Sequence, residues 1–162
     1  MAQSRQHDQS RAPTQRRRKR GAETQAIGRS RGGPSTKVHL IVDALGLPLA
    51  FEITEGQRHD SKPAKGLIAR VLSRCLLADK AYDSDELRES LEARGCAAVI
   101  PSNGSRASKR RYDRELYKER SEIECTFNLL KQARRFATRY EKTLRNYAAV
   151  VAIGCAWLWL RI

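Results

Sequence analysis

The sequence predicts an α/β domain, because segments with strand character alternate with amphipathic helical segments after an initial hairpin. The hairpin is indicated by two β-rich runs, at 37–42 and 49–54, that flank a turn carrying Gly46 and Pro48. Asp43 opens this turn, where Asp often bonds to nearby backbone groups, so we interpret it as a turn residue. With 162 residues, the chain is long enough to bury one hydrophobic core.

After the hairpin, helices and short strands follow one another, and several are marked by their own end signals. Helices are expected at 61–73, 84–94, 114–135 and 143–160, with strands ending at Asp79 and Ile100. Ser61 is expected to cap the first helix, Gly95 to end the second, and Pro101 to stop the second strand. The segment 102–112 is basic and rich in turn residues, and we expect a mobile loop there.

The chain is strongly basic, with 32 Lys and Arg residues against 18 Asp and Glu, and a formal net charge of +14. Such an excess favours a polyanionic partner, most plainly nucleic acid, with membrane surfaces as the competing polyanion. The apolar run 147–160 is shorter than the roughly 20 residues that a membrane-spanning helix needs. The Arg-rich N-terminus lacks the apolar segment of a secretory signal. We therefore expect a cytoplasmic protein with no membrane partner.

The first part of the chain differs in composition from the rest. Residues 1–36 contain few apolar side chains and include the run Arg-Arg-Arg-Lys-Arg at 16–20. A segment of this composition cannot bury a core, so we expect 1–36 to be a disordered basic tail. The folded domain is expected to occupy 37–162.

One predicted helix carries four polar side chains on a single face. Tyr117, Arg120, Glu124 and Lys131 are separated by three, four and seven residues, which stacks them along one side of a helix. A neighbouring apolar stripe that includes Ile123 would seat this helix against a core. The simplest interpretation is an ion-paired surface helix, because Arg120 and Glu124 are ordinary helix partners.

Asp79 favours a functional interpretation of this helix over a simple ion-paired surface. It follows a short apolar run at 75–78, which is the pattern of a buried strand with an acidic residue at its carboxyl end. A carboxylate there and Glu124 on a packed helix could converge on a shared divalent cation. Hard oxygen ligands suit Mg²⁺, and paired metal ions clamp the attacking and leaving oxygens in phosphoryl transfer.

With both segments in view, the chain resembles bacterial insertion-sequence transposases of the DDE class, which have a ribonuclease-H-like catalytic domain. The Tyr-(2)-Arg-(3)-Glu-(6)-Lys spacing of 117–131 is similar to the family signature, and Asp-Lys-Ala-Tyr at 79–82 is similar to its second-aspartate motif. Gly-Arg-Ser-Arg-Gly-Gly at 28–33 resembles the stretch before the second strand of the family, and the segment 56–60 also resembles a family segment. The resemblance runs from about residue 22 to the C-terminus.

The resemblance implies metal-dependent phosphodiester cleavage and strand transfer in the transposition of an insertion sequence. DNA, as transposon ends and target, would be the partner, and Mg²⁺ or Mn²⁺ the cofactor. Asp79 and Glu124 would be catalytic residues and metal ligands. The supporting residues, which would position Glu124, contact DNA phosphates or approach the site from a loop, would be Tyr117, Arg120, Lys131 and His59.

The resemblance also implies a third carboxylate, on a first strand ahead of 28–33, and the sequence offers no such strand. Asp8 is the only acidic residue before Glu23, and no apolar run flanks it. We therefore expect a ribonuclease-H-like domain that lacks its first strand, in the C-terminal part of a transposase. Such a chain would be a truncated product or a second frame joined by frameshifting, with an upstream-frame polypeptide or a second copy as partner. The alternative function is a truncated, non-catalytic, basic DNA-binding remnant or a regulator of the full transposase.

Overall fold

The fold was determined as a computed structural model, which describes residues 2–10 as backbone and residues 25–30 and 33–161 with their side chains. It is a mixed α/β structure built on one six-stranded sheet. The strands are β1 (Ala2–Ser10), β2 (Gly28–Ser30), β3 (Gly33–Val42), β4 (Pro48–Glu55), β5 (Cys75–Ala78) and β6 (Ala97–Val99). The helices are α1 (Ser61–Ile68), α2 (Asp85–Glu92), α3 (Arg114–Lys118), α4 (Ser121–Gln132), α5 (Arg134–Ala137) and α6 (Leu144–Trp159), and a 3₁₀ turn, η2 (Lys80–Tyr82), follows β5.

β1 occupies the centre of the sheet, which corrects two sequence-based expectations. It pairs antiparallel with β3 over eight residues, from Gln3 opposite Val42 to Ser10 opposite Ser35, and parallel with β5. The expected absence of a first strand is therefore wrong, and so is disorder throughout 1–36, since β1, β2 and the start of β3 lie there. The expectation relied on apolar side chains, whereas a central strand is also required by the backbone groups of its two neighbours. The basic run at 16–20 lies outside the described residues.

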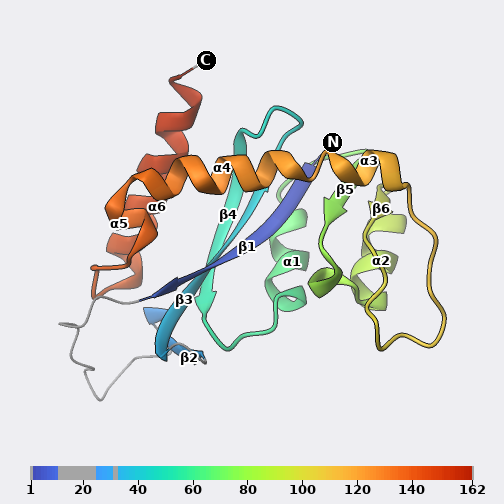
Figure 1. The fold of residues 1–162 in the computed structure, drawn as a ribbon, viewed down its shortest axis with the longest axis horizontal. Helices are drawn as coiled ribbons and strands as arrows, with labels where there is room; N and C mark the ends of the chain where they lie inside the picture. Colours follow the sequence, from blue (N-terminus) through green and yellow to red (C-terminus); the bar gives the residue numbers. More distant parts are fainter. Residues whose placement is uncertain (1, 11–24, 31–32, 162) are drawn as a thin grey trace.

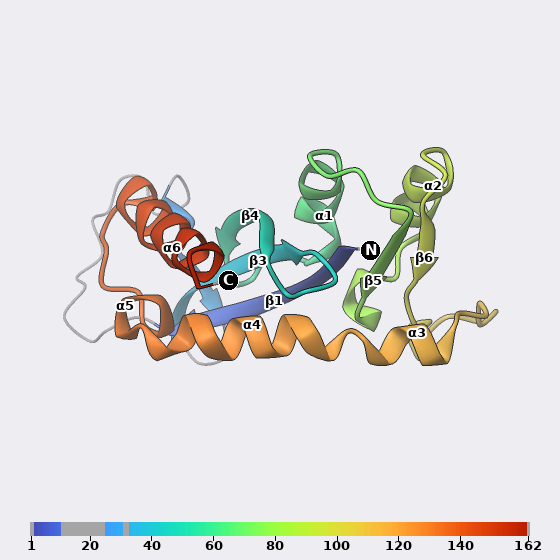
Figure 2. The same ribbon diagram turned by 90° about the horizontal axis from the view of Figure 1, so that it is seen from above.

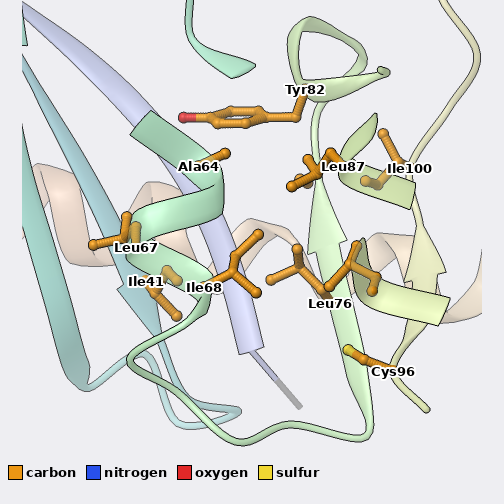
Figure 3. Packing of buried hydrophobic residues seen from close by; sticks show 11 residues of the cluster. Ile41, Ala64, Leu67, Ile68, Leu76, Tyr82, Leu87, Cys96 and Ile100 are labelled. Atoms are coloured by element: carbon orange, nitrogen blue, oxygen red, sulfur yellow. The ribbon is translucent and has the colours of Figure 1, made fainter. Parts of the chain in front are cut away.

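Helices cover both faces of the sheet (Figures 1 and 2). On one face, α4, α5 and α6 pack against Val38, Leu40 and Val42 of β3. On the other face, α1 and α2 enclose a second core that includes Ile41, Leu76 and Tyr82 (Figure 3). Successive residues of a strand point to opposite faces, so β3 supplies both cores from a single run.

The predicted hairpin is confirmed as β3 and β4, and Asp43 acts as the expected turn residue. Its Oδ1 accepts hydrogen bonds from the amides of Leu45 (2.8 Å) and Leu47 (2.9 Å). Gly46 has φ +79°, the left-handed region that glycine tolerates. Its carbonyl accepts a 2.6 Å hydrogen bond from Thr126 Oγ1, which ties the turn to α4.

The first helix differs from its predicted bounds at both ends. α1 begins after Asp60, whose side chain contacts Lys37 Nζ at 2.8 Å instead of capping the helix. The hydroxyl of Ser61, the expected cap, lies 2.9 Å from His59 Nδ1. α1 ends at Ile68 rather than at residue 73, and Arg94 donates hydrogen bonds to the carbonyls of Ile68 and Val71 after the helix end.

The predicted helix 114–135 is divided into α3, α4 and the start of α5. Glu119 and Arg120, which separate α3 from α4, keep helical backbone angles (φ −59° and −58°), so the two helices form one nearly continuous rod (Figure 2). Ala133 is extended, and it ends the rod before α5. The expected helices at 84–94 and 143–160 are confirmed as α2 and α6, capped by the hydroxyls of Ser84 and Thr143. None of the helices in the described ranges is long and apolar enough to cross a membrane.

A fully buried arginine joins the segment before β2 to the C-terminal helices. Arg139 donates hydrogen bonds to Thr36 Oγ1 (2.6 Å), the carbonyl of Gln25 (2.9 Å) and the carbonyl of Glu141 (3.1 Å). Its guanidinium also stacks on the ring of Tyr147, with 4.8 Å from Cζ to the ring centroid. These bonds compensate for removing the charge from water.

We predict that protein stability rises with pH between about 4 and 6.5 because of His39. This buried ring lies 2.9 Å from Thr54 Oγ1 and 3.3 Å from Tyr82 Oη. Burial, helped by the charges of Lys37 and Arg58, lowers the pKa of His39 from 6.5 to about 4. Between these values the unfolded chain binds the extra proton, so the free energy of unfolding increases with pH and levels off above about 6.5.

Urea denaturation at a series of pH values measures this effect, which should amount to about 3 kcal/mol across the window. His39→Gln keeps a donor and an acceptor but cannot titrate, so its profile should lose this part of the slope. His59→Gln is the matched control on an exposed ring and should retain the slope. Parallel profiles for the wild type and His39→Gln would contradict the prediction.

Candidate active site

Asp79 lies directly after β5, on the face of the sheet that α4 covers. Leu76 and Ala78 belong to the core under α1 and α2, so by strand alternation Leu77 and Asp79 face the other side. The backbone of Asp79 is still extended, with φ −79° and ψ 169°. Its Oδ1 accepts a 2.6 Å hydrogen bond from the amide of Ala81, which fixes the half-buried carboxylate at the start of η2.

The rod of α3 and α4 brings Tyr117, Arg120 and Glu124 into contact, as their spacing predicts. Arg120 Nη2 donates a 2.7 Å hydrogen bond to Glu124 Oε1. The same guanidinium lies over the ring of Tyr117, with 5.5 Å from Cζ to the ring centroid. This stack depends on the helical backbone of residues 119 and 120, because a bend there would separate Tyr117 from Glu124.

Tyr117 connects this stack to Asp79. Burial raises the pKa of the Tyr117 hydroxyl; the positive charge of Arg120 opposes the increase, and the carboxylate of Asp79 adds to it. Asp79 acts on Tyr117 through this electrostatic effect, whereas Arg120 contacts both Tyr117 and Glu124 directly. The set of Asp79, Tyr117, Arg120 and Glu124 thus comes from the end of one strand and from one helix face.

The remaining two predicted residues lie apart from this set. Lys131 is in the last turn of α4, about 10 Å along the helix axis from Glu124. His59 is exposed, and its loop is held by the ion pair between Asp60 and Lys37. Lys37 shares the sheet face of Ile41, opposite that of Asp79. The contacts of the described residues do not bring His59 to the carboxylates.

Asp79 and Glu124 offer the hard oxygen atoms that Mg²⁺ prefers. Two carboxylates, with water and substrate phosphate, are a usual ligand set for Mg²⁺. Within the described ranges, however, no three His, Cys, Asp or Glu side chains gather in a way that could hold a metal. β1 pairs Ser4 with Ala78 and Arg5 with Leu40, so the position level with Asp79 is Arg5. Asp8 lies three residues further along β1, about 10 Å away.

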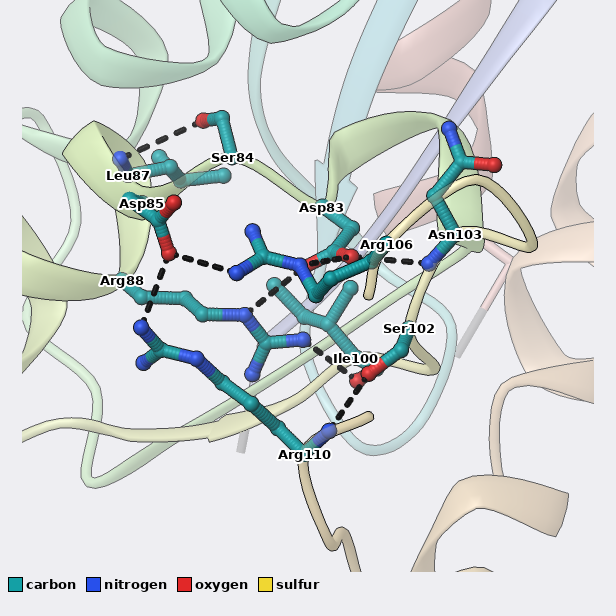
Figure 4. Close-up of polar contacts among 10 residues, drawn as sticks. All are labelled: Asp83, Ser84, Asp85, Leu87, Arg88, Ile100, Ser102, Asn103, Arg106 and Arg110. Carbon is teal, nitrogen blue, oxygen red and sulfur yellow. Dashed lines mark hydrogen bonds and ion pairs between the residues drawn. The ribbon is translucent and has the colours of Figure 1, made fainter. Parts of the chain in front are cut away.

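Sequence reasoning missed a charged network that holds the basic loop after β6 (Figure 4). The side chain of Asp83 is fully buried and accepts hydrogen bonds from Arg88 Nε (2.8 Å), the amide of Asn103 (2.8 Å) and Arg106 Nε (3.0 Å). Asp85 accepts from Arg106 (2.7 Å) and Arg110 (2.8 Å). The loop expected to be mobile is therefore held by two carboxylates that follow the Asp-Lys-Ala-Tyr segment.

The network also sets the ionisation of both acids. Burial alone would raise the pKa of Asp83, but the hydrogen bonds from Asn103, Arg88 and Arg106 outweigh it and lower the pKa. The hydrogen bond from Arg106 lowers the pKa of Asp85. The sequence does contain a signal for this network. Two acids, Asp83 and Asp85, precede an arginine-rich segment, and acids and arginines of this kind often form ion pairs.

Comparison with known protein families identifies the family of the chain. Residues 5–159 match the family described as "Transposase DDE domain". The chain belongs to this family. The match covers the strand that ends at Asp79 and the whole rod that carries Glu124, so both carboxylates lie inside the transposase domain.

Two relatives agree with this assignment. The chain is 43% identical over 129 residues to the "Putative transposase for insertion sequence element IS6501" of Brucella ovis, a match that covers 78% of this chain and 99% of that protein. It is 32% identical over 139 residues to the corresponding protein for IS402 of Burkholderia cepacia, covering 77% of this chain and 63% of that protein. The chain is therefore an insertion-sequence transposase of the DDE type, and it spans less than two thirds of the second relative.

A solved structure supports the fold of the domain. A chain of the simian T-cell lymphotropic virus intasome, solved in complex with the PP2A regulatory subunit B56 gamma, superimposes with a TM-score of 0.53. The match covers 95% of this transposase chain and 46% of that chain, at 13% identity. The order of strands places β1 between β3 of the hairpin and β5, which precedes Asp79, and this agrees with the central first strand of the ribonuclease-H arrangement expected from the sequence.

We predict that Arg106→Ala destabilises the transposase domain and frees the loop. Asp83 is buried and would lose one of its three donors, which costs about 1–3 kcal/mol. Urea denaturation measures the loss, and hydrogen exchange of the amides in 102–112 should become faster. Arg111→Ala, which removes an exposed arginine of the same loop, is the control and should change neither quantity. Unchanged exchange in Arg106→Ala would show that the ion pairs do not hold the loop.

Proposed function

We propose that this domain contributes Asp79 and Glu124 as the metal-binding carboxylates for DNA cleavage and strand transfer in insertion-sequence transposition. The observation that supports the proposal is the position of Asp79 at the end of β5, on the sheet face opposite the core under α1 and α2, together with the contacts of Arg120 with Tyr117 and Glu124. Two acids placed by different elements on one face of the sheet are what a shared cation requires. Ion pairing on a surface helix alone would not involve the strand-end Asp79.

Each side chain of the set has a role that follows from its contacts. Asp79 is oriented by the amide of Ala81, and Arg120 holds the carboxylate of Glu124 in one direction. The planar guanidinium of Arg120 keeps this geometry while partly offsetting the negative charge of the two acids. Lys131, further along the same helix, is placed to contact a DNA phosphate. Mg²⁺ or Mn²⁺, when bound, supplies Lewis-acid activation of the phosphodiester and of the attacking hydroxyl group.

A third carboxylate belongs at the β1 position level with Asp79, where this chain has Arg5. Two acids alone do not hold a pair of ions in the geometry of in-line displacement. We therefore expect the chain to bind DNA on its own and to need an acid at this position for cleavage. A polypeptide from an upstream frame that supplies an acid beside Asp79 would fill the same role.

DNA binding by the free chain should depend steeply on salt, because binding to phosphates releases counterions. Lys109 and Arg111 are exposed loop cations that make no hydrogen bond or ion pair with the described residues. We predict that replacing either with Ala lowers affinity similarly for all sequences and reduces the salt slope by about one.

Lys65→Ala is the matched control, because Lys65 lies outside this loop and its charge is already paired with Glu86. It should leave the salt slope closer to that of the wild type. Fluorescence anisotropy of labelled duplex DNA, titrated at several salt concentrations, measures all three variants. A salt-independent affinity for the unsubstituted chain would rule out the phosphate contacts.

The active-site part of the proposal is tested by building the third carboxylate. We expect the unsubstituted chain to leave end-labelled terminal-repeat DNA intact in Mg²⁺ or Mn²⁺, and Arg5→Asp to nick it. Gln6→Asp is the control, since it introduces a carboxylate one position along and on the alternate side of the strand.

In the Arg5→Asp background, Glu124→Gln should abolish nicking and leave DNA affinity nearly unchanged, because it removes a metal ligand and no phosphate contact. Failure of Arg5→Asp to nick DNA that it still binds would overturn the assignment. Glu124-dependent nicking by the unsubstituted chain would place the third carboxylate elsewhere, with Asp8 the next residue to replace.

A further inference from the structure

One face of α6 is apolar, exposed and uncovered by the described parts of the chain. Ile153, Trp157 and Leu160 are spaced by four and three residues, which aligns them on one side of the helix. Their exposed fractions are 70%, 44% and 84%. No charged residue occurs from Tyr147 to Leu160. In Figure 1 the last turns of α6 extend beyond the level of α4. Contiguous exposed apolar surface of this kind marks interaction sites in soluble proteins.

A groove adjoins this face. It has a volume of about 250 Å³ and lies between the β3–β4 turn, α4 and the end of α6. Its apolar lining is Leu45, Leu47, Leu129 and Leu158, and its charged lining is Glu122 from α4 and Arg161 from the end of α6. Arg161 stacks on the ring of Trp157, 4.6 Å from Cζ to the centroid, which makes the groove and the helix face continuous. Leu45 is 77% exposed at its rim.

The charges of this surface fit a second copy of the same chain. With a net charge of +14, two copies repel each other over most of their surfaces. This face is the exception, because the helix is uncharged and the groove has one acid and one base. Glu122 and Arg161 form no ion pair with each other in the described part of the chain. In a two-fold dimer, residue i of one copy meets residue j of the other and the reverse also holds.

We propose that two copies of the chain associate through α6 and the adjoining groove. Ile153, Trp157 and Leu160 of each copy pack against the other copy, and Glu122 of each copy pairs with Arg161 of its partner. Apolar contact supplies the free energy of association, and the two ion pairs fix the register of the helices. This interface lies away from the loop cations that we assign to DNA, so it does not depend on the proposed function.

Analytical ultracentrifugation of the DNA-free chain over a range of concentrations tests the association. The wild type should sediment as a reversible dimer, and Leu160→Glu and Ile153→Glu should weaken dimerisation by about tenfold or more, since each buries an unpaired charge. Leu72→Glu is the matched control: Leu72 is 94% exposed in the α1–β5 connection, and its replacement should leave dimerisation unchanged. Circular dichroism melts verify that each variant is folded.

Charge exchange distinguishes a specific two-fold contact from non-specific adhesion. Glu122→Arg and Arg161→Glu should each weaken the homodimer by about tenfold, because each creates like-charge contacts. A mixture of the two variants should form a heterodimer in preference, because one of its two contacts keeps the original ion pair and the other has the same pair reversed. A wild type that stays monomeric at every soluble concentration, or a mixture with no preference for the heterodimer, would overturn the proposal.

Discussion

The whole domain depends on β3, which contributes side chains to two cores and pairs with three other strands. Val38, Leu40 and Val42 fill the core under α4, α5 and α6, while Ile41 enters the core under α1 and α2. The backbone of the same strand pairs with β1 on one side, and with β4 and the short β2 on the other. A one-residue slip would exchange the two faces, so both layers of helices lock the register. That register in turn decides which β1 residue stands level with Asp79.

The elements after residue 33 were largely predictable, because each is marked by a local signal. Alternation predicted the hairpin, and the expected starts at 84 and 143 are where the hydroxyls of Ser84 and Thr143 cap α2 and α6, whereas the expected cap Ser61 does not cap α1. β1 was missed because its sequence has no apolar periodicity, and its place is set by unpaired backbone groups of distant strands. Of the site, Asp79 and the stack on α3 and α4 followed from strand-end and helical spacing. Long-range contacts, such as Asp83 with Arg106 and His39 with Tyr82, leave no periodic signal.

The basic residues that contact or belong to the segment 83–113 fall into two groups: some are paired with acids of the domain, and others are exposed. Arg88 and Arg106 neutralise the buried Asp83, and Arg110 pairs with Asp85, so these arginines contribute to architecture. Lys109 and Arg111 remain exposed beside them. Counting basic residues therefore overstates the charge that the loop presents to a polyanion. The same distinction applies to Arg120, whose charge is shared between Glu124 and the ring of Tyr117.

The buried Arg139 has a consequence for how the chain acquires its structure during synthesis. Its bonds to Gln25 and Thr36 span more than a hundred residues, so they cannot form until the ribosome has released nearly the entire chain. Until then, the carbonyl groups of the segment before β2 stay bonded to water while the middle of the domain leaves the ribosome. Closing such a long loop is slow relative to forming helices and hairpins. A nascent chain would thus acquire the β3–β4 hairpin early and secure its first strands last, and ribosomes stalled before codon 139 should carry a domain whose N-terminal segment is still accessible to proteases.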